Sequence, residues 1–190
     1  MDTDYRLQSI NYIPWGCGYF HHLWRLCMII GVILIVSIVI LDQLSKLWIV
    51  YNVAHSVGRI TIIDGFFQIV QHHNYGVAWG QMQNNFLVLY IIPIIALAAF
   101  IYMFRSVNFK TKWFYSTAIT LFIGGTIGNY IDRLFRGYVV DFLDFNIFGY
   151  DFPTFNVADM ALTAGVIAFA IDAFFFEHKR NEKINEKNSI

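Results

Sequence analysis

The stretch GGTIGNYIDRLFRGYVVDFLDFNIFGYDFPTFNVAD, residues 124–159, joins two apolar segments and carries an unusual density of charge for such a position. A charge costs roughly 2.5–3.5 kcal/mol at the centre of a membrane helix, so charges kept beside hydrocarbon predict a functional site. Among them we single out Asp141 and Asp159 as a candidate pair of acting carboxylates. The charged residues considered in this stretch are Asp132, Arg133, Asp141, Asp144, Asp151 and Asp159.

The composition predicts a membrane protein of one domain. Of 190 residues, 57% are hydrophobic and only 14% are charged, and the mean hydropathy is +0.53. Soluble domains carry about 25% charged residues. The net charge of zero argues against a nucleic-acid partner. Two cysteines, Cys17 and Cys27, form no disulfide framework or metal motif, and we expect neither metal nor cofactor.

Four apolar segments are long enough to cross a hydrocarbon core of ~30 Å. We predict spans at about 27–50, 86–104, 113–130 and 157–176, with outer loops at 51–85 and 131–156. Residues 1–25 form an N-terminal extension, and 177–190 form a polar tail. Gly124 and Gly128, four residues apart in the third span, should let another helix approach closely.

Both outer loops contain strand signals. Asp64-Gly65 predicts a hairpin turn between Arg59–Ile63 and the run that begins at Phe66. The run Tyr138–Phe145 is also strand-like, and a turn is expected at Phe148-Gly149. His72 and His73 are adjacent, so in a strand they point to opposite faces and make a poor chelating pair.

The distribution of basic residues predicts the orientation. Nine Lys and Arg side chains lie in the N-terminal extension, the middle loop and the tail, and three lie in the two other loops. The excess predicts cytoplasmic termini. One set of polar residues then falls on the outer side: Asp42, Asn74, Asn129, Asp132, Arg133, Asp141, Asn156 and Asp159.

Two carboxylates that meet in a poorly hydrated site hold one proton between them, which allows general acid–base catalysis without a metal. Helical spacing puts Asn156 beside Asp159. Other interpretations stay open. Asp132 and Arg133 are compatible with interfacial anchors, and Asp159 with a helix-dipole partner. A proton-coupled carrier needs the same residues, whereas a non-enzymatic assembly protein needs neither carboxylate.

The pair Asp42 and Lys46 has two interpretations as well. The two are four residues apart on one helical face, so they either end the first span as an interfacial ion pair or support the site. Asp144 and Asp151 are expected to be solvated loop charges.

Five ordered motifs resemble those of the lipoprotein signal peptidase (signal peptidase II) family over roughly residues 26–176. They are Asp42-Gln43-x-x-Lys46, Asn74-x-Gly76, Gly128-Asn129-x-x-Asp132-Arg133, Val139-Val140-Asp141-Phe142 and Phe155-Asn156-x-Ala158-Asp159. The resemblance implies an aspartic endopeptidase that removes signal peptides from diacylglyceryl-modified prolipoproteins in the bacterial inner membrane. Its active site would face the periplasm, with both termini cytoplasmic.

The same resemblance implies a membrane all-α bundle of four transmembrane helices with a small extracytoplasmic β-rich cradle and a short periplasmic helix. It implies that Asp141 and Asp159 are catalytic. Val77 and Trp79 depart from the family pattern, which has a small residue and phenylalanine there, and Trp79 is expected to alter the substrate groove. The implied supporting or substrate-binding residues are Asp42, Lys46, Asn74, Gly76, Asn129, Arg133, Asn156 and Ala158.

Overall fold

The structure, a computed structural model, describes residues 16–76 and 85–177. Val77 and Trp79, most of the N-terminal extension and nearly all of the polar tail lie outside these residues. The helices are α1 (Gly16–Asn52), η2 (Leu87–Ile91), α2 (Ile92–Phe104), α3 (Trp113–Arg136), α4 (Val157–Ile171) and η3 (Asp172–Glu177). The strands are β1 (Arg59–Ile63), β2 (Phe67–Asn74), β3 (Val139–Ile147) and β4 (Tyr150–Phe155).

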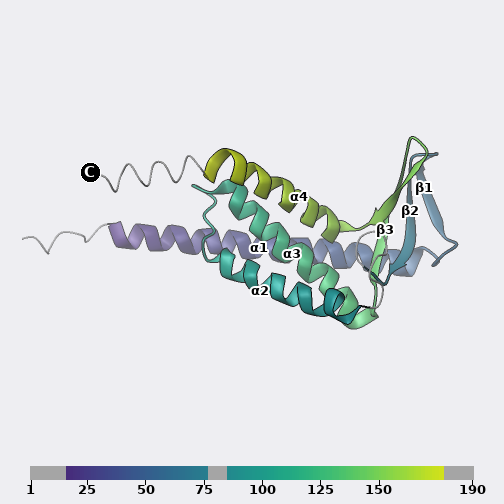
Figure 1. Ribbon diagram of the computed structural model, residues 1–190, viewed down its shortest axis with the longest axis horizontal. Helices are drawn as coiled ribbons and strands as arrows, with labels where there is room; N and C mark the ends of the chain where they lie inside the picture. The colour runs from purple at the N-terminus through teal and green to yellow at the C-terminus, as the bar shows by residue number, and fades with distance from the viewer. Residues whose placement is uncertain (1–15, 77–84, 178–190) are drawn as a thin grey trace, which may run out of the picture.

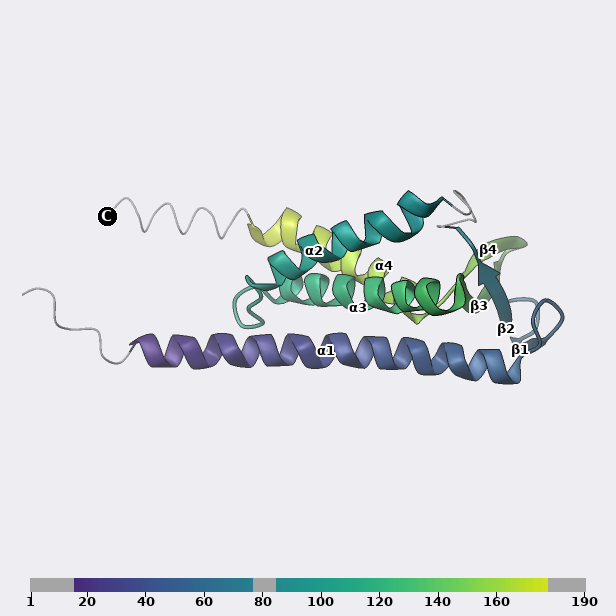
Figure 2. The same ribbon diagram turned by 90° about the horizontal axis from the view of Figure 1, so that it is seen from below.

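The helices form a bundle with the sheet at one end (Figure 1). α3 packs against α1, α2 and α4 and therefore occupies the inside of the bundle. α1 begins at the end of the bundle where α4 finishes, and the sheet lies at the opposite end (Figures 1 and 2). This arrangement brings α1, α3, α4 and β3 together where the helices meet the sheet.

In the described part of the chain, three helices have the length and hydropathy of a membrane span. They are Trp24–Asn52, Leu87–Phe104 and Val157–Glu177. α3, expected as a further span, is not among them, because glycine, threonine and asparagine interrupt its apolar residues. This composition agrees with the inner position of α3. Because α3 packs against α1, α2 and α4, its small and polar residues can face other helices.

The second apolar segment begins with a π-helical turn, η2, and continues as α2. Pro93 lies in the first turn of α2. Proline has no backbone N–H and is tolerated at a helix start, so the change from η2 to α2 accommodates it without breaking the segment.

The four strands form one antiparallel sheet in the order β1-β2-β3-β4. The predicted hairpin at Asp64-Gly65 joins β1 to β2, and Gly65 has a positive φ of 67°. β2 pairs with β3 although a long stretch of sequence separates them, and His72 lies opposite Asp141. β4 pairs with β3 from Leu143 onward. The first residues of β3 are thus paired with β2 only and face the helices on their other side.

The sheet is attached to the bundle through the far end of α1. Ile49 and Val53 are buried against Val140 and Phe142 of β3. A second apolar cluster, around Phe104, Val107, Ile119 and Ile123, joins α2 and α3 at the opposite end. The last turn of α1 and the residue after it therefore pack directly beneath β3.

Glycines in α3 allow the close approach predicted from their spacing. A Cβ on Gly128 would lie 2.6 Å from Oδ2 of Asp42 and 3.2 Å from the Cβ of Ala158, so this position faces α1 and α4 at once. A Cβ on Gly125 would lie 2.6 Å from the carbonyl oxygen of Ala158. Residues larger than glycine would push α4 away from α3 at the level of the site.

Two boundaries differ from those predicted. α1 begins at Gly16 rather than near residue 27, and α3 continues past Tyr130 to Arg136. Asp132 and Arg133 therefore lie in the last turns of a helix and not in a loop. The short outer helix implied by the family likeness has no counterpart in the described residues of the loop between α1 and η2.

Candidate active site

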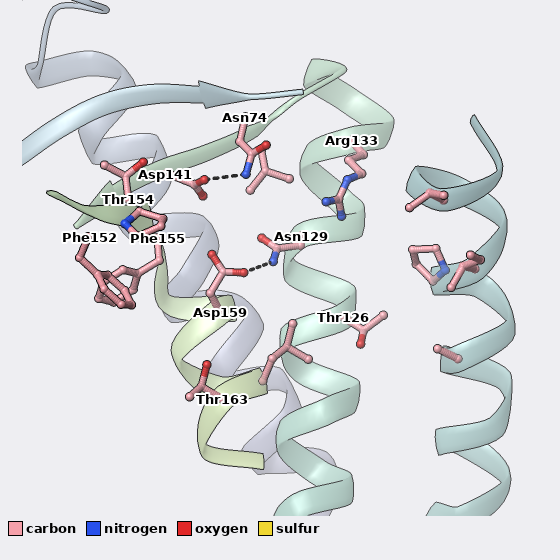
Figure 3. Close-up of a pocket in the computed structure, with 17 residues that line it drawn as sticks. Asn74, Thr126, Asn129, Arg133, Asp141, Phe152, Thr154, Phe155, Asp159 and Thr163 are labelled. Atoms are coloured by element: carbon pink, nitrogen blue, oxygen red, sulfur yellow. Dashed lines mark hydrogen bonds between the residues drawn. The ribbon is translucent and has the colours of Figure 1, made fainter. Parts of the chain in front are cut away.

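The two aspartates singled out from the sequence reach one cavity from different elements. Asp141 lies on β3 and Asp159 in the first turn of α4. Both line a cavity of about 550 Å³, and Figure 3 shows their carboxyl groups directed into it. Asp144 and Asp151 do not line this cavity: Asp144 accepts a hydrogen bond from Gln68 (2.6 Å), and Asp151 is exposed on β4.

The start of α4 fixes the Asp159 carboxylate. Asn156 is the N-cap, and its Oδ1 accepts a hydrogen bond from the backbone N–H of Asp159 at 3.0 Å. Oδ2 of Asp159 accepts the backbone N–H of Asn156 at 3.2 Å, which completes a capping box. Asp159 therefore lies at the N-terminus of α4, where it can interact with the helix dipole as considered from the sequence. It also has a second contact, because its Oδ1 accepts a hydrogen bond from Asn129.

Asp141 is held between two amide groups. Its Oδ2 accepts from Nδ2 of Asn74 at 2.9 Å, and its Oδ1 accepts from Nδ2 of Asn156 at 2.7 Å. Asp141 is only 2% exposed to solvent. Burial, and then repulsion from Asp159, raise the pKa of Asp141 to about 7, although the two amide donors act in the opposite direction. Asp141 is thus poised to gain or lose a proton near neutral pH.

Asn156 and Asn129 connect the two carboxylates. Nδ2 of Asn156 donates to Asp141 and also to Oδ1 of Asn129 (3.2 Å). Nδ2 of Asn129 in turn donates to Oδ1 of Asp159 at 2.7 Å. The route Asp141–Asn156–Asn129–Asp159 is unbroken, so the orientation of each carboxylate depends on the other. Figure 3 shows its last step, from Asn129 to Asp159.

The chain just after β2, up to Gly76, adjoins the site on the side of Asp141. Oδ1 of Asn74 accepts the backbone N–H of Gly76 at 2.9 Å, which leaves its Nδ2 free to face Asp141. The guanidinium of Arg133 donates to the carbonyl oxygen of Gly76 at 3.3 Å and lines the cavity. Arg133 therefore holds the chain at Gly76, whereas the ion pairs found in the described residues involve Lys46 and Arg136.

Behind the cavity is a fully buried charge cluster. Nζ of Lys46 lies 2.8 Å from Asp42 and 3.0 Å from Asp132, and all three side chains are inaccessible to solvent. Lys46 also donates to Oδ1 of Asn129 at 3.0 Å, so all three ammonium protons have acceptors. Of the two interpretations of Asp42 and Lys46, the contacts favour support of the site. Asp132 is 0% exposed and pairs with Lys46 and Arg136, so its contacts favour a role inside the protein over that of an interfacial anchor.

Two further members of this cluster were not singled out from the sequence. Nε2 of Gln43 donates to Asp42, to Asp132 and to the carbonyl oxygen of Gly128. Arg136 pairs with Asp132 one turn away on α3. Gln43 belongs to the Asp42-Gln43-x-x-Lys46 motif, and the four-residue spacing of Asp132 and Arg136 predicts a same-face pair, so both signals were available.

The cavity has a polar centre flanked by apolar side chains. The polar groups are the two aspartates with Asn74, Asn129 and Arg133. Apolar side chains come from η2, α2 and α4 on one side and from β4 on the other, where Phe152 and Phe155 lie beside the aspartates (Figure 3). Within the described residues, no cluster of three or more His, Cys, Asp or Glu side chains has the arrangement of a metal site.

The part of the chain that builds this site matches a known protein family. The family described as Signal peptidase (SPase) II matches residues 34–175, which includes every residue of the site. The chain belongs to the signal peptidase II family. Membership identifies a membrane protease, and the three apolar helices agree with it.

Relatives and solved structures cover nearly the same region. Lipoprotein signal peptidases of Staphylococcus aureus strains JH9 and Newman are each 40% identical over 153 residues, which is 80% of this chain and 93% of theirs. Two solved structures described as bacterial membrane enzymes superimpose with TM-scores of 0.68 and 0.67, at 38% and 39% identity. Each covers 77% of this chain, and the match covers 91% and 93% of those structures.

Proposed function

We propose that this member of the signal peptidase II family is an aspartic endopeptidase that removes signal peptides from diacylglyceryl-modified prolipoproteins. The observation that carries the proposal is that Asp141 and Asp159 line one cavity and are joined through Asn156 and Asn129. The curated relatives, named as lipoprotein signal peptidases, support the choice of substrate.

The pair acts by sharing one proton. Asp159 accepts hydrogen bonds from Asn129 and from the backbone N–H of Asn156 at a helix N-terminus, and these contacts favour its ionised form. Asp141, with its raised pKa, is the partner that carries the proton near neutral pH. Ionised Asp159 then takes a proton from the attacking water while protonated Asp141 polarises the scissile carbonyl. No covalent intermediate is required.

The remaining polar residues orient this pair. Asn74 and Asn156 hold Asp141, Asn129 holds Asp159, and Arg133 fixes the loop at Gly76. Asp42 and Lys46 support them from behind, and Ala158 donates its backbone N–H to Asp42. Substrate contacts are assigned to the residues that line the cavity, among them Asn74 and Arg133.

A cavity with polar groups at its centre and apolar residues around them suits a lipid-anchored peptide. The diacyl chains stay in lipid beside the apolar residues of α2 and α4, while the peptide bond reaches the carboxylates. We further propose that α3 is a fourth span inside the bundle, that both termini are cytoplasmic in a bacterial inner membrane, and that the site faces the periplasm. The excess of Lys and Arg on the inner segments supports this orientation.

The test is cleavage of a lipidated precursor by the purified protein. Asp141→Asn and Asp159→Asn should each abolish cleavage while leaving membrane insertion intact. Asp144→Asn is the matched control, since Asp144 lies on the same strand but hydrogen-bonds to Gln68 outside the cavity. Wild-type cleavage should survive a chelator. Near-normal processing by either dyad variant would refute the assignment.

A further inference from the structure

The two proposed catalytic aspartates share a backbone feature that their own hydrogen bonds do not reveal. In each case, the residue immediately before the aspartate donates its backbone N–H to a buried carboxylate. The N–H of Val140 donates to Oδ2 of Asp132 at 3.1 Å, and Asp141 follows. The N–H of Ala158 donates to Oδ1 of Asp42 at 2.9 Å, and Asp159 follows.

Both N–H groups are ones that the secondary structure leaves without an acceptor. β4 pairs with β3 only from Leu143 onward, so the helix-facing edge at Val140 has no strand beside it. Ala158 is in the first turn of α4, where backbone N–H groups have no partner within the helix. Asp132 from α3 and Asp42 from α1 therefore fix the backbone at the base of each catalytic side chain.

A single ammonium group links these two clamps. Nζ of Lys46 contacts Asp42 at 2.8 Å and Asp132 at 3.0 Å, and its third proton goes to Asn129. Lys46 is 0% exposed, and the contacts fill its donor capacity. Its position therefore sets how far apart the carboxylates of Asp42 and Asp132 lie, and through them the two backbone segments.

We propose that Lys46 is a positioning residue that sets the separation of the Asp141 and Asp159 carboxyl groups through two carboxylate–backbone clamps. The inference rests on the proposed function of that pair. β3 and α4 are separate elements, so their separation is not fixed by local geometry. A misplacement of about 1 Å can reduce a rate by about 100-fold, so a rigid spacer has a direct catalytic consequence.

A simpler role would be charge balance. A buried lysine between two carboxylates could serve only to neutralise them, and its removal alone would leave buried charges unpaired and destabilise the fold. The triple variant Asp42→Asn, Lys46→Met, Asp132→Asn separates the two roles. The asparagine Oδ1 atoms can still accept from Val140 and Ala158, and the three positions carry no charge, but the spacer is gone. Arg136 loses its carboxylate partner, yet its side chain is 18% exposed and can still donate to the Oδ1 of asparagine at position 132.

The triple variant should insert and fold, with kcat lower by about 100-fold and KM unchanged. A second readout is the Kd of a peptide with a hydroxyl group at the scissile position, which mimics the tetrahedral intermediate and must fit between both carboxyls. This Kd should rise by a similar factor, whereas a partly unfolded sample would lower kcat without weakening the analogue. Thr120→Val is the control, because Thr120 is buried on α3 and bonds only to Ser116 in the described contacts.

Wild-type kcat in the folded triple variant would overturn the inference and leave charge balance as the role of Lys46. If the triple variant does not fold, Asp42→Asn and Asp132→Asn are measured separately. A lowered kcat with unchanged KM in at least one of them supports the spacer, and wild-type kcat in both overturns it. Asp141→Asn in the same assay keeps the two proposals apart: if it is inactive, the proposed function stands whatever Lys46 does; if it is active, both proposals fail.

Discussion

Asn156 and Asp159 cap each other across the first turn of α4, with the Asn156 side chain accepting the Asp159 N–H and the Asp159 carboxylate accepting the Asn156 N–H. A helix cap is usually a stability device. Here the same carboxylate faces the cavity, and the same asparagine donates to Asp141. The residues that cap the start of α4 are therefore the same residues that orient the proposed catalytic pair.

Replacement of Asn156 should separate these two roles. Serine still caps a helix but has no amide group to donate to Asp141 and Asn129. We expect Asn156→Ser to keep nearly the wild-type thermal stability and to lose about 100-fold in cleavage rate, since the Asp141 carboxyl loses its support. Asn156→Ala should lose the activity and also about 1 kcal/mol of stability. Equal melting temperatures for the two variants would contradict the cap contribution.

Cleavage should fall as the pH rises through about 7, because burial and Asp159 raise the pKa of Asp141 to about 7 and the reaction uses its protonated form. The amide of Asn74 donates to this carboxylate and lowers its pKa. Asn74→Ala should therefore raise the pKa and move the alkaline limb of the kcat profile to higher pH. Gln68→Ala, next to Asp144, is the control and should leave the limb in place. A limb that moves to lower pH would contradict the assigned proton.

Gly128→Ala should damage the site although it replaces no polar side chain. The added Cβ would meet Oδ2 of Asp42 at 2.6 Å, and Asp42 cannot turn aside because Lys46 and Ala158 hold it. We expect lower thermal stability, since overpacking costs about 1–3 kcal/mol. We also expect a cleavage rate lower by at least about tenfold, because a displaced Asp42 shifts the backbone before Asp159. Ala164→Leu, at an exposed position of α4, adds more volume and should have little effect.

The end of α1 should contribute to stability and cleavage through its packing under β3. Ile49 is 2% exposed and packs under β3 against Val140 and Phe142. Ile49→Ala should cost about 2–5 kcal/mol and weaken cleavage, because it loosens the strand that carries Asp141. The neighbour Trp48 is 50% exposed, and Trp48→Ala should be far milder. Melting curves of the two purified variants check this difference, and equal losses would contradict it.

Parts of the fold follow from local sequence and others do not. The hairpin at Asp64-Gly65, the strand that contains Asp141 and the turn at Phe148-Gly149 all lie where their residues predict them. The end of α3 does not, because charged Asp132 and Arg133 read as a loop when they are taken alone. The helix continues past Asp132 because the buried Asp132 carboxylate pairs with Lys46 and Arg136 and accepts the N–H of Val140.

The sequence by itself determined the membrane class, the apolar segments, the strands of the two long loops, the family and the identity of the proposed acidic pair. Composition, hydrophobic length and ordered motifs are local properties of the chain. Only the tertiary structure decided which side chains meet. Asp42 holds the backbone before Asp159, Asp132 holds the backbone before Asp141, and Lys46 joins them. These contacts depend on α1 packing against α3 and α4, which are far from it in sequence. Such buried polar contacts form because every donor and acceptor removed from water must find a partner, and that partner is chosen by packing in three dimensions.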